Sequence, residues 1–367
     1  MRVLRKIHRW LGLALALPLL VQGLTGAVLT LEPVWPGGGG HAFGPTASVN
    51  AILDSARGAA PPGMRAARYV SPEEPGDAAR VYLAPLDNPR GPGQVLRLNP
   101  ATAMVLGAAE PTGGVLDWTK RLHNNLLIPE WGGRQVAGWF GVGLLVLTLI
   151  GIPLWWPAPG RWRSGLTVPR RASGLRLHRA LHGAAGAWLV LMLLATSVTG
   201  VVQGFPQTCR ALLGLPIGGP PRPGRSVPGA PLPRPDLDAA IRLAQVAMPG
   251  TVPRAILLPA TEQEPVRLQM TPPGQEGAIV TRTVSVDAAA TRVVSAQTSL
   301  PPADMAMRWA HDLHEGQGLG PVWRGLTVAV GLALPLFGVT GAGMWFLRRR
   351  NQHRLHMVRQ AAMQAGE

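Results

Sequence analysis

The stretch RKIHRWLGLALALPLLVQGLTGAVL, residues 5–29, decides the fold of this chain. Its apolar run, residues 10–31, is long enough for one membrane crossing, because a hydrocarbon core of ~30 Å needs roughly 20 apolar residues in a helix. The run is longer than the apolar part of a signal peptide and no convincing cleavage site follows it, so we expect a retained helix. Comparable runs at residues 136–156, 184–205 and 322–347 predict three more transmembrane helices.

The composition agrees with a membrane protein that also has water-exposed parts. Of 367 residues, 47% are hydrophobic and only 15% are charged. The formal net charge of +16 is compatible with nucleic-acid binding. The basic residues cluster beside the apolar runs, however, which favours a role in membrane topology and no nucleic-acid partner. The single cysteine, Cys209, excludes an intramolecular disulfide and a cysteine-based cluster or zinc site.

Lysine and arginine near the apolar runs set the expected orientation. Basic residues crowd the N-terminus, the link at residues 157–183 and the tail at residues 348–367. We therefore expect both termini in the cytoplasm and two long segments outside. The predicted organisation is a first helix with its cytoplasmic N-terminus (1–32), outer module 1 (33–135), second helix (136–156), basic loop (157–183), third helix (184–205), linker with outer module 2 (206–321), fourth helix (322–347) and basic tail (348–367).

An internal repeat relates the two halves of the chain. HRWLGLALALPLLVQGLTG, from residue 8, matches HGAAGAWLVLMLLATSVTG, from residue 182, and WTKRLHNNL, from residue 118, matches WAHDLHEGQ, from residue 309. Both outer segments read as an amphipathic helix, a turn and a strand, followed by a strand, an Asn- or Asp-led turn and another strand. The sequence predicts an all-α four-helix membrane bundle with two outer α+β modules, built by duplication of a helix–module–helix unit.

The repeat places four histidines in matched positions. His8 and His182 begin the first and third helices on the cytoplasmic side, and His123 and His314 precede the second and fourth helices on the outer side. Histidine is a common axial ligand of haem iron, and facing helices of a bundle often build such sites. We interpret the four histidines as ligands of two b-type haems, His8 with His182 and His123 with His314. Repetition inherited without function is the competing interpretation.

Two neighbouring histidines leave the ligand assignment open. His178 precedes His182 by one helical turn and His311 precedes His314 similarly, so either could replace its neighbour. His41, His353 and His356 are interpreted as solvated. The Thr-Gly pairs at residues 25–26, 199–200 and 340–341 are interpreted as sites of close helix approach. The second helix has Ile150 before Gly151 instead of threonine, which we expect to affect only packing.

Together these features resemble the PepSY-associated transmembrane family. The resemblance rests on RKIHRWLGL…LTG, the second LH…TG helix, the Leu-His before each outer-to-inner helix and the two strand-turn-strand modules, and it covers nearly the whole chain. It implies an iron-regulated protein of the bacterial inner membrane with periplasmic PepSY-like modules. Some members are siderophore reductases with two haems, which implies the same four histidine ligands here.

Two functions follow as expectations. The first is transmembrane electron transfer from a quinol or a cytoplasmic reductase to a periplasmic ferric siderophore or another iron chelate, which releases iron because hard oxygen ligands hold ferric iron far better than ferrous iron. The sequence has no dinucleotide fingerprint or P-loop, so the electrons must come from another molecule. The alternative is a non-enzymatic, membrane-anchored periplasmic binding or regulatory protein in iron uptake.

Overall fold

The computed structural model describes residues 1–31, 47–72, 77–87, 93–109, 115–215, 231–273, 282–299, 302–317 and 319–364. The glycine run at residues 37–40, His41 and most of the Pro/Gly-rich linker lie outside these residues. The chain divides into two compact units. The helical unit comprises Met1–Val34, Thr119–Cys209 and Trp309–Glu367, and the sheet unit comprises Trp35–Trp118 and Arg210–Arg308. Each unit therefore takes segments from both halves of the sequence.

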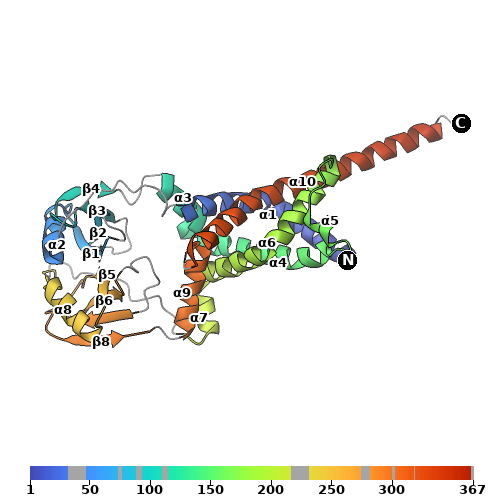
Figure 1. Ribbon diagram of the computed structural model, residues 1–367. Coiled ribbons are helices and arrows are strands. Elements are labelled where there is room, and N and C mark those ends of the chain that lie inside the picture. The colour runs from blue at the N-terminus through green and yellow to red at the C-terminus, as the bar shows by residue number, and fades with distance from the viewer. Residues whose placement is uncertain are drawn as a thin grey trace. The chain divides into compact units, whose positions relative to one another are not determined.

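Four long helices dominate the helical unit (Figure 1). They are α1 (Arg2–Leu31), α4 (Gly133–Trp155), α6 (Gly174–Gly204) and α10 (Gly320–Gln364). All four are long and apolar enough to cross a membrane. This confirms the four predicted membrane helices. Shorter helices accompany them: α3 (Val115–Asn125), the 3-10 turn Pro129–Trp131, α5 (Trp162–Leu166), α7 (Pro206–Leu212) and α9 (Pro302–His314).

Two of the long helices extend well beyond the predicted boundaries. Helix α6 begins at Gly174 rather than near residue 184, so the end of the predicted loop at residues 157–183 is helical. Helix α10 continues to Gln364 instead of ending near residue 347. The apolar run marks the part of a helix suited to hydrocarbon, whereas leucine, arginine and alanine beyond it still favour helix in water.

The four helices pack in a ring in which α1 contacts α10 and α4, and α6 contacts α4 and α10. Glycines allow the closest approaches. A Cβ on Gly331 would lie 2.7 Å from the carbonyl oxygen of Gly23, and a Cβ on Gly138 would lie 2.9 Å from the Cα of Gly204. The shared core takes residues from every helix: Leu19, Leu144, Leu147, Met192, Leu193, Val330 and Leu334.

The sheet unit holds one antiparallel sheet of eight strands in the order β4-β3-β2-β1-β5-β6-β7-β8 (Figure 1). The strands are β1 (Met64–Val70), β2 (Ala79–Pro85), β3 (Gln94–Leu98), β4 (Val105–Ala109), β5 (Val252–Leu257), β6 (Val266–Thr271), β7 (Arg282–Val286) and β8 (Val293–Gln297). The two predicted modules therefore form a single sheet. They join where β1 pairs with β5, with Tyr69 opposite Ile256.

Local sequence chemistry explains both outermost hairpins. The Asn99 side chain accepts hydrogen bonds from the backbone N–H groups of Ala101 and Thr102, at 2.9 and 3.2 Å, in the turn between β3 and β4. Asp287 accepts from the backbone N–H groups of Thr291 and Arg292, at 2.7 and 3.0 Å, between β7 and β8. These are the Asn- and Asp-led turns that the sequence predicts, and they act as side-chain mimics of a backbone turn.

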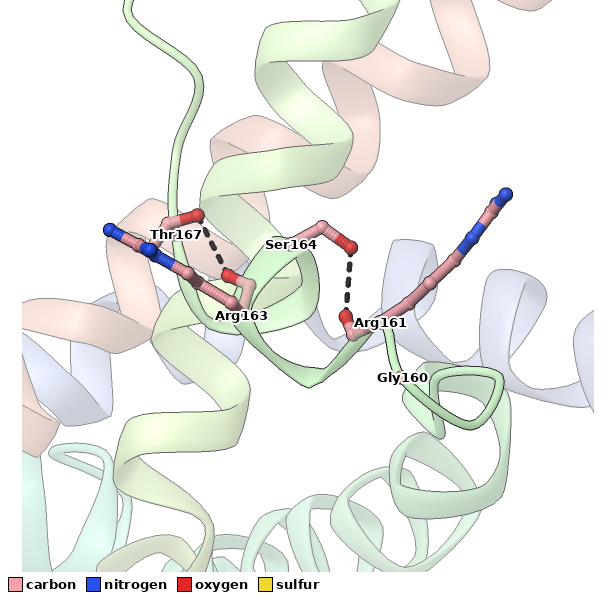
Figure 2. Close-up of a pocket in the computed structure, with 5 residues that line it drawn as sticks. All are labelled: Gly160, Arg161, Arg163, Ser164 and Thr167. Carbon is pink, nitrogen blue, oxygen red and sulfur yellow. Dashed lines mark hydrogen bonds between the residues drawn. The ribbon is translucent and has the colours of Figure 1, made fainter.

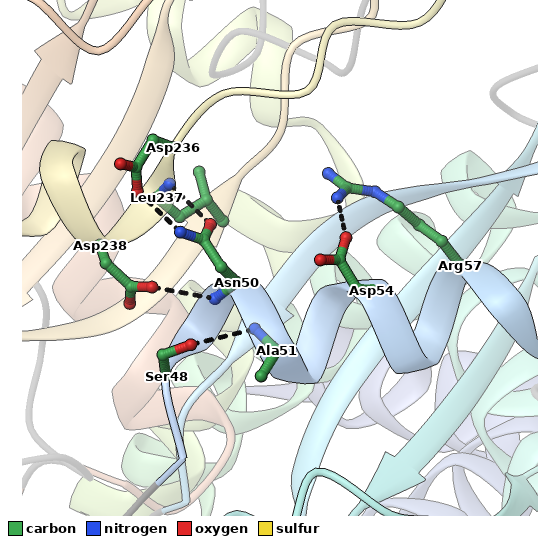
Figure 3. A network of polar contacts seen from close by, with 8 residues as sticks. All are labelled: Ser48, Asn50, Ala51, Asp54, Arg57, Asp236, Leu237 and Asp238. Atoms are coloured by element: carbon green, nitrogen blue, oxygen red, sulfur yellow. Dashed lines mark hydrogen bonds and ion pairs between the residues drawn. The ribbon is translucent and has the colours of Figure 1, made fainter.

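One face of the sheet is covered by α2 (Val49–Gly58) and α8 (Leu237–Ala247). The N-termini of these helices cap each other (Figure 3). Asp238 accepts from the backbone N–H groups of Val49 and Asn50, at 3.0 and 3.4 Å, while the Asn50 side-chain oxygen accepts from the N–H of Leu237 at 2.9 Å. The Asn50 amide donates to Asp236 at 2.7 Å. Orphan N–H groups of each helix are thus satisfied by the other.

The opposite face of the sheet is rich in arginine. Strand alternation places Arg68 and Arg80 on the face away from Tyr69 and Val81, which belong to the core. Arg97 lies directly opposite Arg80, and the Arg68 guanidinium lies 5.8 Å from the ring centroid of Tyr82. Arg68, Arg80 and Arg97, called the arginine face below, therefore concentrate positive charge on this face of the sheet.

Candidate functional site

The structure brings the four predicted histidines together as two pairs within the helical unit. His8 of α1 faces His182 of α6, with ring centroids 6.1 Å apart and ring planes at 79°. His123 of α3 faces His314 of α9, with centroids 6.3 Å apart and planes at 44°. These are the two pairings that the repeat predicts.

The ring separations fit two ligands on opposite sides of one iron ion. A metal–imidazole nitrogen bond is about 2.0 Å long. In a five-membered ring with bonds of about 1.33 Å, each nitrogen lies about 1.1 Å from the ring centroid. Two imidazoles that bind one iron ion from opposite sides would therefore have centroids about 6.2 Å apart, given these lengths. The observed separations of 6.1 and 6.3 Å agree with that value.

The two pairs lie near opposite ends of α1 and α6. Helix α1 supplies His8 to one pair and contacts His123 of the other through Thr25. Helix α6 supplies His182 and contacts His314 through Thr199. Positions 8 and 25 of a helix are about 26 Å apart along its axis at ~1.5 Å per residue, a distance close to the thickness of a hydrocarbon core.

Threonine hydroxyls contact three of the four rings. Thr25 Oγ1 lies 2.9 Å from His123 Nδ1, and Thr199 Oγ1 lies 3.0 Å from His314 Nδ1. Thr340 Oγ1 of α10 lies 2.9 Å from His182 Nδ1. The Thr-Gly pairs were predicted to permit close helix approach. Gly200 does lie at such an approach, since its carbonyl carbon is 3.5 Å from the position of a Cβ on Gly141 of α4. The threonines of the three pairs contact the histidines in addition.

The glycine of each pair lies beneath the same ring. A Cβ on Gly26 would lie 3.0 Å from His123 Cε1, and one on Gly200 would lie 3.2 Å from His314 Cε1. The corresponding distances are 3.9 Å from Gly341 to His182 and 3.6 Å from Gly151 to His8. All four rings therefore lie next to a glycine of a neighbouring helix. At Gly26 and Gly200 a Cβ would be closer to the ring than ordinary van der Waals contact, whereas at Gly151 and Gly341 it would not.

His8 is the exception in its polar contacts. Ile150 replaces the threonine before Gly151, and the buried Nδ1 of His8 has no hydrogen-bond partner among the described residues. The backbone carbonyl of Leu147, three residues before Ile150, lies near this ring. The prediction that the missing threonine affects only packing is therefore wrong: it removes a polar partner from a histidine.

The outer histidines of the repeat are neutral at neutral pH. Burial lowers the pKa of His123 to about 4, and the adjacent His314 ring adds to this effect. Burial likewise lowers the pKa of His314 to about 4. Neutral imidazole is the form that binds a metal ion, because it retains an unprotonated nitrogen.

The two alternative histidines have other partners. His178 Nδ1 lies 2.9 Å from the carbonyl oxygen of Gly174, and its ring packs on Gly343. His311 Nε2 lies 3.1 Å from a carboxylate oxygen of Glu315, and its Nδ1 contacts the Gln203 amide. The ring pairing thus favours His182 and His314 as ligands. His353 is exposed on α10, as expected for a solvated side chain.

Sequence reasoning missed two buried polar groups close in sequence to the His123–His314 pair. Asn125 Oδ1 and Arg324 Nε are buried and have no hydrogen-bond partner among the described residues. Asn125 ends α3 after His123, and the backbone of Arg324 lies 3.5 Å from the position of a Cβ on Gly316, just after His314. Nothing in the local pattern distinguishes Arg324 from other basic residues at helix ends.

Other candidate sites are weak. The described residues contain no group of three or more His, Cys, Asp or Glu side chains that could hold a metal ion. An open cavity of about 570 Å³ is lined by Gly160, Arg161, Arg163, Ser164 and Thr167. In Figure 2 its two arginine side chains extend in different directions, and its hydroxyls are used in local bonds to backbone carbonyls. It includes none of the paired histidines.

Comparison with known proteins agrees with this architecture. The family described as the PepSY-associated TM region matches residues 5–348. The chain belongs to this family. It is a membrane protein: the match covers the sheet unit and most of each of the four long apolar helices, although α10 continues beyond residue 348. The uncharacterized protein PA4219 of Pseudomonas aeruginosa is 31% identical over 261 residues, which is 64% of this chain and 64% of that relative.

Proposed function

We propose that the protein is a di-haem electron-transfer protein of the bacterial inner membrane that reduces a periplasmic ferric chelate, such as a ferric siderophore. The main support is the spacing of the two histidine pairs, 6.1 and 6.3 Å between ring centroids. His8 and His182 would hold one b-type haem, and His123 and His314 the other. Bound haem supplies one-electron transfer between its ferric and ferrous states.

The two ends of the helical unit support the transmembrane direction of the proposed reaction. Both termini and residues 157–183 carry the basic residues expected on the cytoplasmic side, which supports a cytoplasmic-side position of the His8–His182 pair. The His123–His314 pair would then face the periplasm, together with the sheet unit. The duplication of a helix–module–helix unit would account for one histidine of each pair coming from each half.

The reaction is the one-electron reduction of a chelated ferric ion, with the electron supplied by a quinol or a cytoplasmic reductase. Ferrous iron is a softer ion than ferric iron and is held less tightly by hard oxygen ligands, so reduction releases it. The arginine face of the sheet could bind an anionic chelate. Arg324, with its buried Nε, could pair with a haem propionate at the His123–His314 site.

An absorption spectrum of the detergent-purified full-length protein tests the proposal. Protein from haem-replete cells should show a sharp α-band on reduction with dithionite and contain two haems per chain. Addition of a ferric siderophore to the reduced protein should then restore the oxidised spectrum and release ferrous iron to a ferrous-specific chelator. A protein that stays colourless, even after incubation with haemin, would refute the proposed cofactor and the reductase activity.

The second candidate is a non-enzymatic, membrane-anchored periplasmic binding or regulatory protein in iron uptake. The arginine face favours it, because Arg68, Arg80 and Arg97 concentrate positive charge without requiring any cofactor. Under this function the protein would bind an anionic ferric chelate but would contain no haem and would not reduce the iron. Calorimetry with the wild-type protein, together with its haem content and the release of ferrous iron, separates the two functions.

A further inference from the structure

The threonine hydroxyls that contact the histidines also contact their own helices. Thr25 Oγ1 lies 2.7 Å from the carbonyl oxygen of Val21, and Thr340 Oγ1 lies 2.6 Å from that of Leu336. Thr199 Oγ1 lies 2.8 Å from the carbonyl oxygen of Ala195. A carbonyl oxygen can only accept, so each hydroxyl donates its one proton to its helix. It can therefore only accept a hydrogen bond from the histidine.

This arrangement fixes the tautomer of three rings. Nδ1 of His123, His182 and His314 must carry the hydrogen that it donates to threonine, at 2.9, 2.9 and 3.0 Å. Nε2 of a neutral ring is then unprotonated and available to a metal ion. A partner that accepts from the second ring nitrogen is the usual way in which proteins orient a ligating histidine and raise its basicity.

His8 rests on a glycine as the other rings do but has no hydroxyl beside it. The 3.6 Å from a Cβ on Gly151 to His8 Cε1 places the ring in the same kind of cradle. Ile150 occupies the position of the threonine, and His8 Nδ1 has no hydrogen-bond partner among the described residues. In the His8–His182 pair, His182 thus has a hydroxyl partner at Nδ1, whereas His8 has none among the described residues.

We propose that the threonine of each Thr-Gly pair is a positioning residue that sets the tautomer of one histidine, and that Ile150 makes His8 the unsupported member of the four. For the haems, the inference rests on the proposed function. Hydrogen bonding that raises the basicity of an axial histidine favours ferric iron. The haem held by His8 and His182 therefore has the higher midpoint potential.

The tautomers can be measured without any cofactor. NMR spectra of haem-free, full-length wild-type protein labelled with ¹⁵N-histidine are compared with those of Ile150→Thr. Ile150→Val is the control, because valine has the shape of threonine but lacks its hydroxyl. His8 is assigned by the loss of its signals in His8→Gln. We expect Nδ1–H signals for His123, His182 and His314, and a shift of His8 to the same tautomer only in Ile150→Thr. A wild-type His8 already in that tautomer, or no shift in Ile150→Thr, would overturn the proposal.

The potentials of the haem-loaded protein provide a second measurement. In a redox titration followed at the α-band, Ile150→Thr should lower the potential of one haem relative to Ile150→Val. Thr25→Val should raise the potential of the other haem. Equal potentials in Ile150→Thr and Ile150→Val would contradict the inferred effect on the haem. If no haem binds, the proposed function fails, whereas the tautomer measurement still decides the roles of threonine and Ile150.

Discussion

In both histidine pairs each ring lies next to a glycine of a neighbouring helix, but the pairs differ in their threonine contacts and in the glycine distances. In the His123–His314 pair both rings bind a threonine hydroxyl and lie tightly on glycine, with Cβ positions 3.0 and 3.2 Å away. In the His8–His182 pair only His182 binds a threonine, and the glycine distances are 3.6 and 3.9 Å. The chain thus contains one symmetric, tight pair of histidines and one asymmetric, looser pair.

This difference teaches that a small change beside a ligand can distinguish two otherwise equivalent sites. Ile150 presents only apolar branches where the other three rings contact a threonine hydroxyl, so the hydrogen-bond acceptor is absent at this position. Because unpaired buried polar atoms are costly, such a position needs either a partner or a functional reason. The proposed electron transfer between two inequivalent sites would supply such a reason.

Loss of a histidine should have the largest effect. His8→Ala should reduce the haem content from two per chain to one, and His123→Ala should do the same, because each pair would hold a haem separately. The double variant should bind none. Pyridine haemochrome analysis of the purified proteins measures these contents, with His353→Ala, an exposed histidine, as the control. Loss of both haems in either single variant would show that the pairs are not independent.

Substitution of the glycines that lie next to the histidine rings should have a smaller effect, and this effect should differ between the two pairs. Gly26→Ala places a Cβ 3.0 Å from His123, closer than ordinary van der Waals contact, so the ring must shift. Gly341→Ala places one 3.9 Å from His182, which is an ordinary contact. We expect reduced haem content or a displaced α-band in Gly26→Ala and wild-type behaviour in Gly341→Ala. A larger effect of Gly341→Ala than of Gly26→Ala would mean that the His8–His182 pair is packed more tightly than the His123–His314 pair.

Disruption of the sheet unit should leave the difference between the pairs intact. Asn50→Ala and Asp238→Ala each remove cap hydrogen bonds between α2 and α8, and each should cost about 1 kcal/mol of stability. The double variant should cost less than the sum, because both residues belong to one network. Thermal unfolding of the full-length protein measures the loss. A change in either haem potential would indicate coupling that the separate units do not predict.

The smallest expected effect is a pH dependence of the same cap. The backbone N–H of Ala239, and then the Asn50 amide, lower the pKa of the Asp236 carboxyl below its usual value. A lowered folded pKa means that the contribution to stability is present above the unfolded pKa and is lost as the pH falls through the folded value. Between pH 6 and pH 3 the unfolding temperature should fall less in Asp236→Asn than in the wild type. An equal fall would exclude this carboxylate as a contributor.

The sequence predicts some strands of the sheet but not all of them, and it does not predict how they pair. The strand-turn-strand patterns around Asn99 and Asp287 identify β3, β4, β7 and β8, because an Asn or Asp turn between β-branched residues is a local signal. Strands β2 and β6 escaped prediction, and so did the joining of both modules into one sheet. The β1–β5 pairing brings Tyr69 beside Ile256, residues from different halves of the chain, and no short-range pattern encodes it.

By itself the sequence determined the four membrane helices, the repeat and the pairing of the four histidines. These depend on apolar length, residue spacing and matched motifs, all of which are local or periodic properties. Only the tertiary structure decided that Thr25, Thr199 and Thr340 meet the rings, and that Ile150 leaves His8 without such a partner. Each of these contacts joins two different helices, and their registers are set by packing across the bundle rather than by any single helix.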